Sequence, residues 1–251
     1  AKLKDIGTPE AVNAFVDEVA HLMRSQAAAV LGNVLVVFPV VLLLSVGIGL
    51  LLGHPMLSAK DAAYTLHSLS LLGPTLLFAG FTGCLLFASS IIAGWVENWF
   101  VLRRLDSAMR YNPGINGILG VERAGRWAHF MRNNISAFAS NISLGFMLGL
   151  IPPIMAFFSL PLEVRHVTLS AGQLAAASVA YGVQTVFMPA FWWAVAAIPL
   201  IGALNLGVSF YLAYKLALRA HNVSGVQRAH IHQAIWARWR HRPLSFFIPA
   251  G

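Results

Sequence analysis

Glu163, Arg165 and His166 stand together between two long apolar runs of the chain. A carboxylate two residues from a guanidinium, beside an imidazole, could transfer a proton or hold an anion. A short solvated loop would explain the same three residues. Asn141, inside the preceding apolar run, adds an amide that could serve helix packing or a path for water or substrate. We treat Asn141, Glu163, Arg165 and His166 as a candidate polar site.

The remaining reactive residue types indicate no catalytic, metal or cofactor site. His230 and His232 supply two ligands, whereas a zinc site usually uses three or four. Cys84 is the single cysteine and lies in an apolar run, so no disulfide can form within the chain. We therefore expect no cofactor, and we expect no enzymatic activity in this segment.

Long stretches without Asp, Glu, Lys or Arg must position these side chains. Such residues make up 10% of the chain, against about 25% in a typical soluble domain. About 20 apolar residues cross a bilayer as a helix. Four charge-free runs reach that length: Ala27–Gly53, Ser68–Val96, Asn133–Leu162 and Val167–Tyr214. This pattern predicts an all-α integral membrane protein.

The last run is 48 residues long and must hold more than one helix. Pro189 divides a weakly hydrophobic part, 167–188, from a strongly hydrophobic part, 190–214. Residues 97–134 carry a net charge of +3 and residues 215–251 a net charge of +6, and both should be cytoplasmic because basic loops stay inside. We therefore predict four membrane-crossing helices plus a partly inserted or re-entrant segment, 167–188, with a basic cytoplasmic tail. A fifth crossing would place that tail outside.

Three regions follow from these patterns. Residues 1–26 form an amphipathic lead-in helix, 27–214 a helical membrane domain and 215–251 the basic tail. The chain begins with Ala1 rather than Met, so we expect an upstream region of the same protein to precede it. The lead-in helix either leads into the membrane or offers that upstream region a docking face.

Two further sets of residues indicate contact surfaces. Gly145 and Gly149 have the spacing that lets helix backbones approach closely, within the chain or in a homo-oligomer. Arginines near the predicted membrane surface could bind lipid headgroups or nucleic-acid phosphates. These candidates are Arg103, Arg104, Arg228, Arg238, Arg240 and Arg242. We favour lipid over nucleic acid, because the tail is tethered where lipid is always present.

Several short segments together resemble a known family. They include Ile92-Ala93-Gly94-Trp95, Gly145-Phe146-Met147-Leu148-Gly149-Leu150, Arg165-His166-Val167-Thr168-Leu169-Ser170 and Asn205-Leu206-Gly207-Val208-Ser209-Phe210. The chain resembles the membrane-embedded C-terminal part of the proteobacterial family catalogued as "site-specific recombinase", over nearly its whole length. The resemblance implies a chain more than twice this long, with a helical region upstream.

The family label implies DNA recombination, which the residues do not favour. A tyrosine recombinase needs a tyrosine nucleophile among arginines, but Tyr181, Tyr211 and Tyr214 lie in apolar runs. We expect a multi-pass scaffold or anchor in the bacterial inner membrane, with membrane lipids and the upstream region as partners. The alternatives are a transporter or channel for small solutes or ions, and a protein associated with DNA recombination.

Overall fold

The computed structural model describes residues 9–220 and 225–248, with side chains from residue 10 to 220 and from 229 to 248. Every regular element in these ranges is a helix, and none is a strand, which confirms the predicted all-α class. The α-helices are α1 (Pro9–Leu52), α2 (Ala59–Leu69), α3 (Thr75–Leu102), α4 (Leu105–Arg110), α5 (Pro113–Leu119), α6 (Val121–Phe157), α7 (Val167–Tyr181), α8 (Pro189–Ala220) and α9 (Gly225–His241). Two 3-10 helices, η1 (Gly182–Phe187) and η2 (Pro243–Phe246), complete them.

Four of these helices, α1, α3, α6 and α8, are long and apolar enough to cross a membrane. Their apolar side chains are widely exposed, as with Leu51 (87%) and Phe146 (64%). Exposed apolar surface on this scale suits hydrocarbon rather than water. The predicted number of long apolar helices is therefore confirmed, while insertion of these helices into a bilayer stays a prediction.

Helix boundaries depart from the predicted ones in two places. The lead-in helix and the first span form one continuous helix, α1, across residues 26 and 27. Likewise α6 begins at Val121, well before the charge-free run that starts at Asn133, and continues through Pro152 and Pro153 to Phe157. Each apolar span and the polar turns next to it therefore form one continuous helix. A hydropathy pattern shows where the apolar part begins but does not show where the helix begins.

A short helix, α2, precedes α3, although it contains Lys60 and Asp61 and lies largely outside the charge-free runs. Ser58 caps this helix: the Asp61 amide donates to Ser58 Oγ (3.1 Å), and Ser58 Oγ donates to Asp61 Oδ2 (2.6 Å). Ala62, Leu66 and Leu69 are fully buried. Their spacing places them on one face of the helix.

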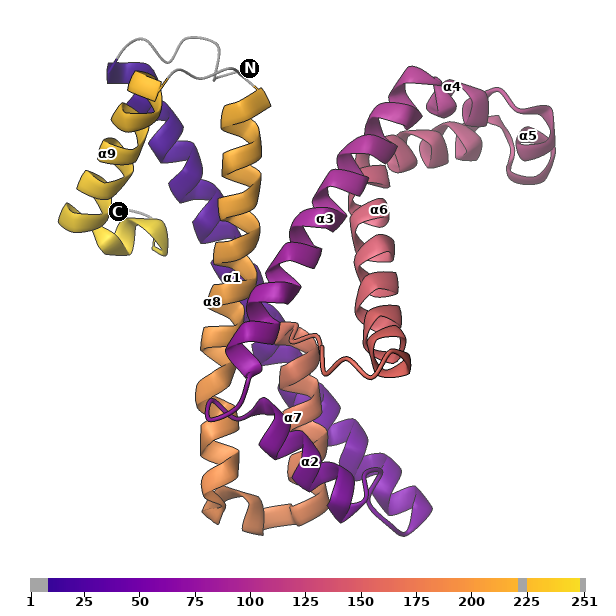
Figure 1. Cartoon of the computed structure of the whole chain (residues 1–251). Coiled ribbons are helices and arrows are strands. Elements are labelled where there is room, and N and C mark those ends of the chain that lie inside the picture. Colours follow the sequence, from indigo (N-terminus) through magenta and orange to yellow (C-terminus); the bar gives the residue numbers. More distant parts are fainter. Residues whose placement is uncertain (1–8, 221–224, 249–251) are drawn as a thin grey trace. The chain divides into compact units, whose positions relative to one another are not determined.

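The chain divides into two compact units, unit one (Ala1–Gly80 and Arg165–Gly251) and unit two (Phe81–Val164). In unit one, α7 lies alongside α1, α2 and α8 (Figure 1). Gly202 on α8 permits this close packing, since a Cβ there would lie 3.2 Å from Val30 Cγ1 and 3.4 Å from Val167 Cγ2. The core of unit one contains Leu66, Leu69, Val167, Leu174, Ala177, Phe191, Ala194, Ala197, Ile198 and Ile201.

In unit two, α4 lies against the first turns of α6 (Figure 1). Ala124 and Ala128, two small residues of α6, are buried there. Asp106 of α4 pairs with Arg132 of α6 at 3.2 Å. The predicted basic loop, 97–134, is therefore largely helical.

Candidate functional site

A buried polar junction lies midway along α8, where Asn205 is only 1% exposed. Its Oδ1 accepts a hydrogen bond from the Val167 amide (3.0 Å). Its Nδ2 donates to the carbonyls of Ala79 (2.9 Å) and Arg165 (2.9 Å). One amide side chain thus joins α8 to the start of α3 and to the start of α7.

The junction follows from the way α2 and α7 end inside the core of unit one. A helix leaves backbone groups at its ends without intrahelical partners, and burying them unpaired is costly. Asn205 satisfies the amide at the start of α7. At the end of α2, Thr75 Oγ1 lies 2.9 Å from the Ser68 carbonyl and 2.8 Å from the Ser70 carbonyl. Arg165 Nη2 also donates to the Ser68 carbonyl (3.1 Å).

The four predicted polar-site residues are divided between the two units. Arg165 is 6% exposed and contacts the junction, with its guanidinium 5.9 Å from the Phe78 ring. His166 is the N-cap residue of α7 and lies outside the four long helices. Its burial lowers the pKa, because desolvation disfavours the imidazolium. Asn141, exposed on α6, and Glu163 belong to unit two.

Arg165 thus belongs to a folded junction, and His166 is partly buried next to it in the chain. The junction's central residue, Asn205, was not among the residues singled out from the sequence. A signal for it existed: Asn205 is an isolated amide within the strongly hydrophobic stretch 190–214. A polar side chain in such a helix should face other helices. A buried cation such as Arg165 would also suit a transporter. However, its guanidinium donates to the Ser68 carbonyl near the end of α2, which is a structural role.

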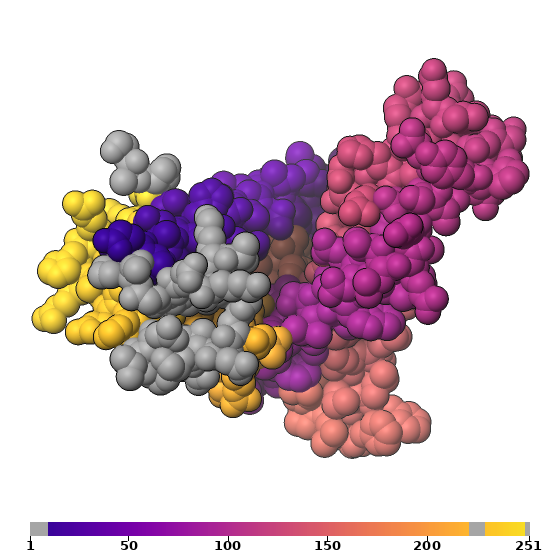
Figure 2. Space-filling view, turned by 90° about the horizontal axis from the view of Figure 1, so that it is seen from above, coloured from indigo at the N-terminus to yellow at the C-terminus, as the bar shows by residue number. Residues whose placement is uncertain are grey.

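The two ends of the described chain meet in a second region, which we call the terminal lobe. It consists of the first turns of α1, the last turns of α8, and α9 with η2. Val12, Leu218 and Ile231 are buried together there, with Phe15 and Tyr214 against them. Figure 2 shows the indigo start of α1 in contact with the yellow C-terminal helices. The basic tail is therefore folded onto α1 over the described residues.

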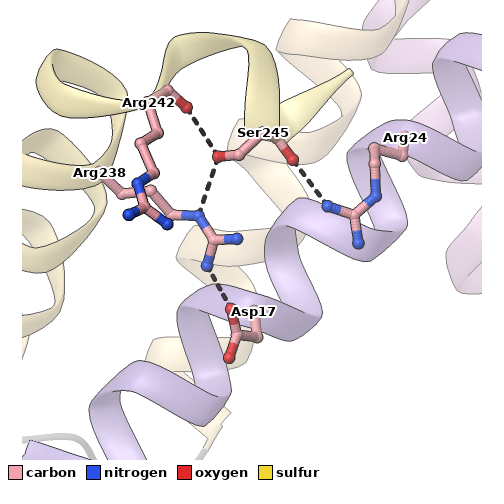
Figure 3. Close-up of polar contacts among 5 residues, drawn as sticks. All are labelled: Asp17, Arg24, Arg238, Arg242 and Ser245. Atoms are coloured by element: carbon pink, nitrogen blue, oxygen red, sulfur yellow. Dashed lines mark hydrogen bonds and ion pairs between the residues drawn. The ribbon is translucent and has the colours of Figure 1, made fainter. Parts of the chain in front are cut away.

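A polar clasp closes the terminal lobe (Figure 3). The guanidinium of Arg238 forms an ion pair with Asp17, and Arg238 Nε donates to Ser245 Oγ (3.0 Å). Ser245 Oγ donates to the Arg242 carbonyl (2.7 Å), and Arg24 Nη1 donates to the Ser245 carbonyl (2.7 Å). The nearly buried Ser245 therefore connects α9 with α1: its hydroxyl contacts Arg238 of α9, and its carbonyl contacts Arg24 of α1.

The six arginines predicted to contact headgroups have different surroundings in the structure. Arg238 is occupied by Asp17 and Ser245, and its guanidinium lies 5.7 Å from the Phe246 ring. Arg240 and Arg242 in the lobe are exposed, as are the side chains of Arg103 and Arg104 between α3 and α4. The side chain of Arg228 lies outside the described residues. Headgroup contact stays a prediction for the exposed arginines.

Gly145 and Gly149 face open space in unit two. A Cβ at either position would meet no atom within 4 Å. The close packing predicted for this pair is therefore not made by the helices of unit two. An interface between copies of the chain stays a prediction.

The tyrosines have distinct surroundings. Tyr181 Oη donates to the Ala59 carbonyl (3.0 Å), Tyr214 lies in the apolar centre of the terminal lobe, and Tyr211 is exposed on α8. Tyr111, which was not singled out from the sequence, is 69% exposed and lies under the Arg110 guanidinium at 5.5 Å. Among the residues that the structure describes, no group of three His, Cys, Asp or Glu could hold a metal ion.

These features define a class: an all-helical protein with four helices suited to a bilayer, a buried junction of half-length helices, and a clasp between its two ends. A family model described as "Site-specific recombinase" matches residues 1–249, so the chain belongs to the site-specific recombinase family. No curated protein and no solved structure matches it.

Proposed function

We propose that this chain is a multi-pass scaffold domain of a bacterial inner membrane, which anchors the upstream part of its protein at the cytoplasmic surface. The observation that carries the proposal is the exposed apolar surface of α1, α3, α6 and α8. A helix that keeps such surface in water loses the free energy that burial in hydrocarbon would provide. The bilayer is the solvent that these four helices require.

The charge distribution supports an orientation for the proposed domain. The basic segment from α4 to the start of α6 and the basic terminal lobe both follow apolar spans, and basic segments stay in the cytoplasm. Four crossings place both of them on that side. A helix as short as α7, with 15 residues, is about 22 Å long, less than the roughly 30 Å of a hydrocarbon core. We propose that α7 enters the membrane only partly and that Asn205 supplies the partner its first turn requires.

The terminal lobe supports the anchoring role. It holds the start of α1 and the C-terminal helices together, so an upstream region would join the chain on the side of this lobe. Exposed Trp236 and Arg240 lie on α9 of this lobe. Tryptophan and arginine are the residue types that favour a membrane surface.

Carbonate extraction of membranes that contain the chain tests the proposal. Alkaline carbonate removes peripheral proteins, and we expect the chain to stay in the membrane pellet until detergent is added. A matched chain with Leu43→Lys and Leu44→Lys, two exposed positions inside the apolar part of α1, should be partly released, because charge near the centre of a span is costly. Complete release of the unaltered chain by carbonate would overturn the proposal.

A role in DNA recombination is the second candidate, favoured by the family match and by one pair of residues. Tyr111 is an exposed hydroxyl beside the cationic Arg110, and a tyrosine nucleophile needs cations at the scissile phosphate. Incubation with a DNA oligonucleotide and denaturing electrophoresis would detect a covalent adduct. An adduct that Tyr111→Phe abolishes and Tyr181→Phe retains would establish this function over the scaffold.

A further inference from the structure

We propose that unit two holds one anionic diacyl phospholipid, with its phosphate between α4 and α6 and an acyl chain between α3 and α6. The inference deepens the proposed function and rests on it, since it requires a bilayer around these helices. It concerns residues other than the arginines predicted from the sequence. Two hollows of unit two, one cationic and one apolar, carry it, and α6 lines both of them.

The cationic hollow has a volume of about 780 Å³. Arg110 of α4 lines it with Arg126, His129 and Asn133 of α6. The three α6 residues recur at the spacing of one helix face. Glu122 is the acidic residue of this lining, so the two arginines leave the hollow with a positive balance. Arginine binds phosphate through several N–H groups at once.

Two local features hold Arg110 over α6. The ion pair between Asp106 and Arg132 fixes α4 against α6, one turn before Arg110 on the same short helix. Gly125 leaves space for the arginine: a Cβ at Gly125 would lie 3.8 Å from Arg110 Nε. The branched end of a leucine at Gly125, which extends beyond the Cβ, would compete with the guanidinium for this place.

The apolar hollow has a volume of about 620 Å³ and lies between α3 and α6. Ile92 and Val96 of α3 line one wall, and Met131, Ile135 and Ile142 are among the residues of the other. No Asp, Glu, Lys or Arg lines it within the part of the chain that the structure describes. An acyl chain is the ligand that such a groove fits when it lies in a bilayer.

Three aromatic rings join the two hollows. Phe130 lines the cationic hollow, while Trp127 and Phe138 line the apolar one. The Phe130 ring is stacked on Trp127 at 5.7 Å and meets Phe138 edge-on at 6.0 Å. A ligand with an anionic head and an apolar chain would use both sides of this aromatic wall. Inorganic phosphate and nucleic acid would use the cationic side alone.

Retention of lipid by the purified chain tests the proposal. The chain in neutral detergent is mixed with equal amounts of phosphatidylglycerol and phosphatidylcholine, and retained lipid is measured by native mass spectrometry. We expect one phosphatidylglycerol per chain. The double variant Arg110→Gln/Arg126→Gln should weaken its binding by about 30-fold, the loss expected for two cationic contacts at a membrane surface. The control, Lys215→Gln/Arg219→Gln, removes the same charge from two exposed residues of α8 in unit one. It should change binding by less than about 5-fold, because diffuse attraction between charges is screened within about 10 Å.

Two further variants separate the head from the chain of the lipid. Ala139→Phe fills the apolar groove and leaves every charge in place, so it should lower binding of phosphatidylglycerol without affecting binding of inorganic phosphate. Gly125→Leu displaces Arg110 without changing the net charge, and it replaces the double arginine variant if that variant does not fold. We expect it to give the same loss of preference for phosphatidylglycerol.

Each remaining outcome overturns the inference. Equal losses in the double variant and its control would mean diffuse attraction rather than a site. Displacement of lipid by inorganic phosphate alone, or a preference for a DNA oligonucleotide over phosphatidylglycerol, would assign the cationic hollow to another ligand. A chain that stays monodisperse in buffer without detergent or lipid would refute the membrane function itself, a result distinct from loss of this one site.

Discussion

Replacing Asn205 by leucine would test the polar junction, because leucine has a similar shape and no hydrogen-bonding group. The substitution removes three hydrogen bonds, from the Val167 amide and to the carbonyls of Ala79 and Arg165. A typical buried hydrogen bond contributes about 1 kcal/mol net, and polar contacts between membrane helices average about 0.6 kcal/mol. Three such contacts therefore predict a loss of about 2–3 kcal/mol in the free energy of unfolding.

Thermal unfolding in detergent would measure this loss. For a chain of this size, about 1 kcal/mol shifts the melting temperature by about 2–4 °C, so Asn205→Leu should lower it by about 4–12 °C. The matched control is Asn141→Leu, the same chemical change at an exposed position of α6. We expect no measurable loss from the control. Equal melting temperatures for the two variants would refute the role assigned to Asn205.

Three other predictions concern single residues. Arg238→Ala should speed amide hydrogen exchange in η2 and the end of α9, because the clasp to Asp17 and Ser245 is lost, whereas exposed Arg240→Ala should leave exchange unchanged; equal rates in both variants would contradict the clasp. His166 has a lowered pKa in the folded chain. Below about pH 6.5 the unfolded chain therefore binds more protons than the folded chain, and the stability decreases as the pH is lowered. His166→Gln should flatten that acid decline in melting temperature, and an unchanged slope would count against it. Tyr181→Phe should leave any recombination phenotype intact while costing about 1 kcal/mol of stability through the lost bond to the Ala59 carbonyl.

Hydropathy and charge patterns predicted the helical class and the long apolar helices. Runs without charge predicted the four long apolar helices, because about 20 apolar residues in succession have few other uses. These runs did not predict α2, because this helix lies largely between two of them and contains Lys60 and Asp61. Its buried residues Ala62, Leu66 and Leu69 form one apolar face. The absence of charged residues indicates which segments can enter lipid. The periodicity of apolar residues indicates which face of a helix packs against its neighbours, and only this periodicity could have predicted α2.

The candidate sites were less predictable, because they depend on contacts between distant parts of the chain. Arg238 reads as a free basic residue of a tail until Asp17, 221 positions earlier, is found beside it. Asn205 likewise finds its partners 38 to 126 positions away. Sequence spacing alone cannot show such pairs. What the sequence could have indicated was that an isolated amide in an apolar helix needs partners from other helices.

Labelling of single cysteines in intact cells tests the four-crossing membrane domain most directly. In a Cys84→Ala background, exposed positions on each proposed side are replaced by cysteine and treated with a thiol reagent that cannot cross the inner membrane. We expect Lys60→Cys, on α2, and Leu160→Cys, after α6, to react. Ile118→Cys, on α5, and His230→Cys, on α9, should react only after the membrane is opened. Reaction of His230→Cys in intact cells, with Ile118→Cys still protected, would contradict the four-crossing arrangement and require a fifth crossing between α6 and α9.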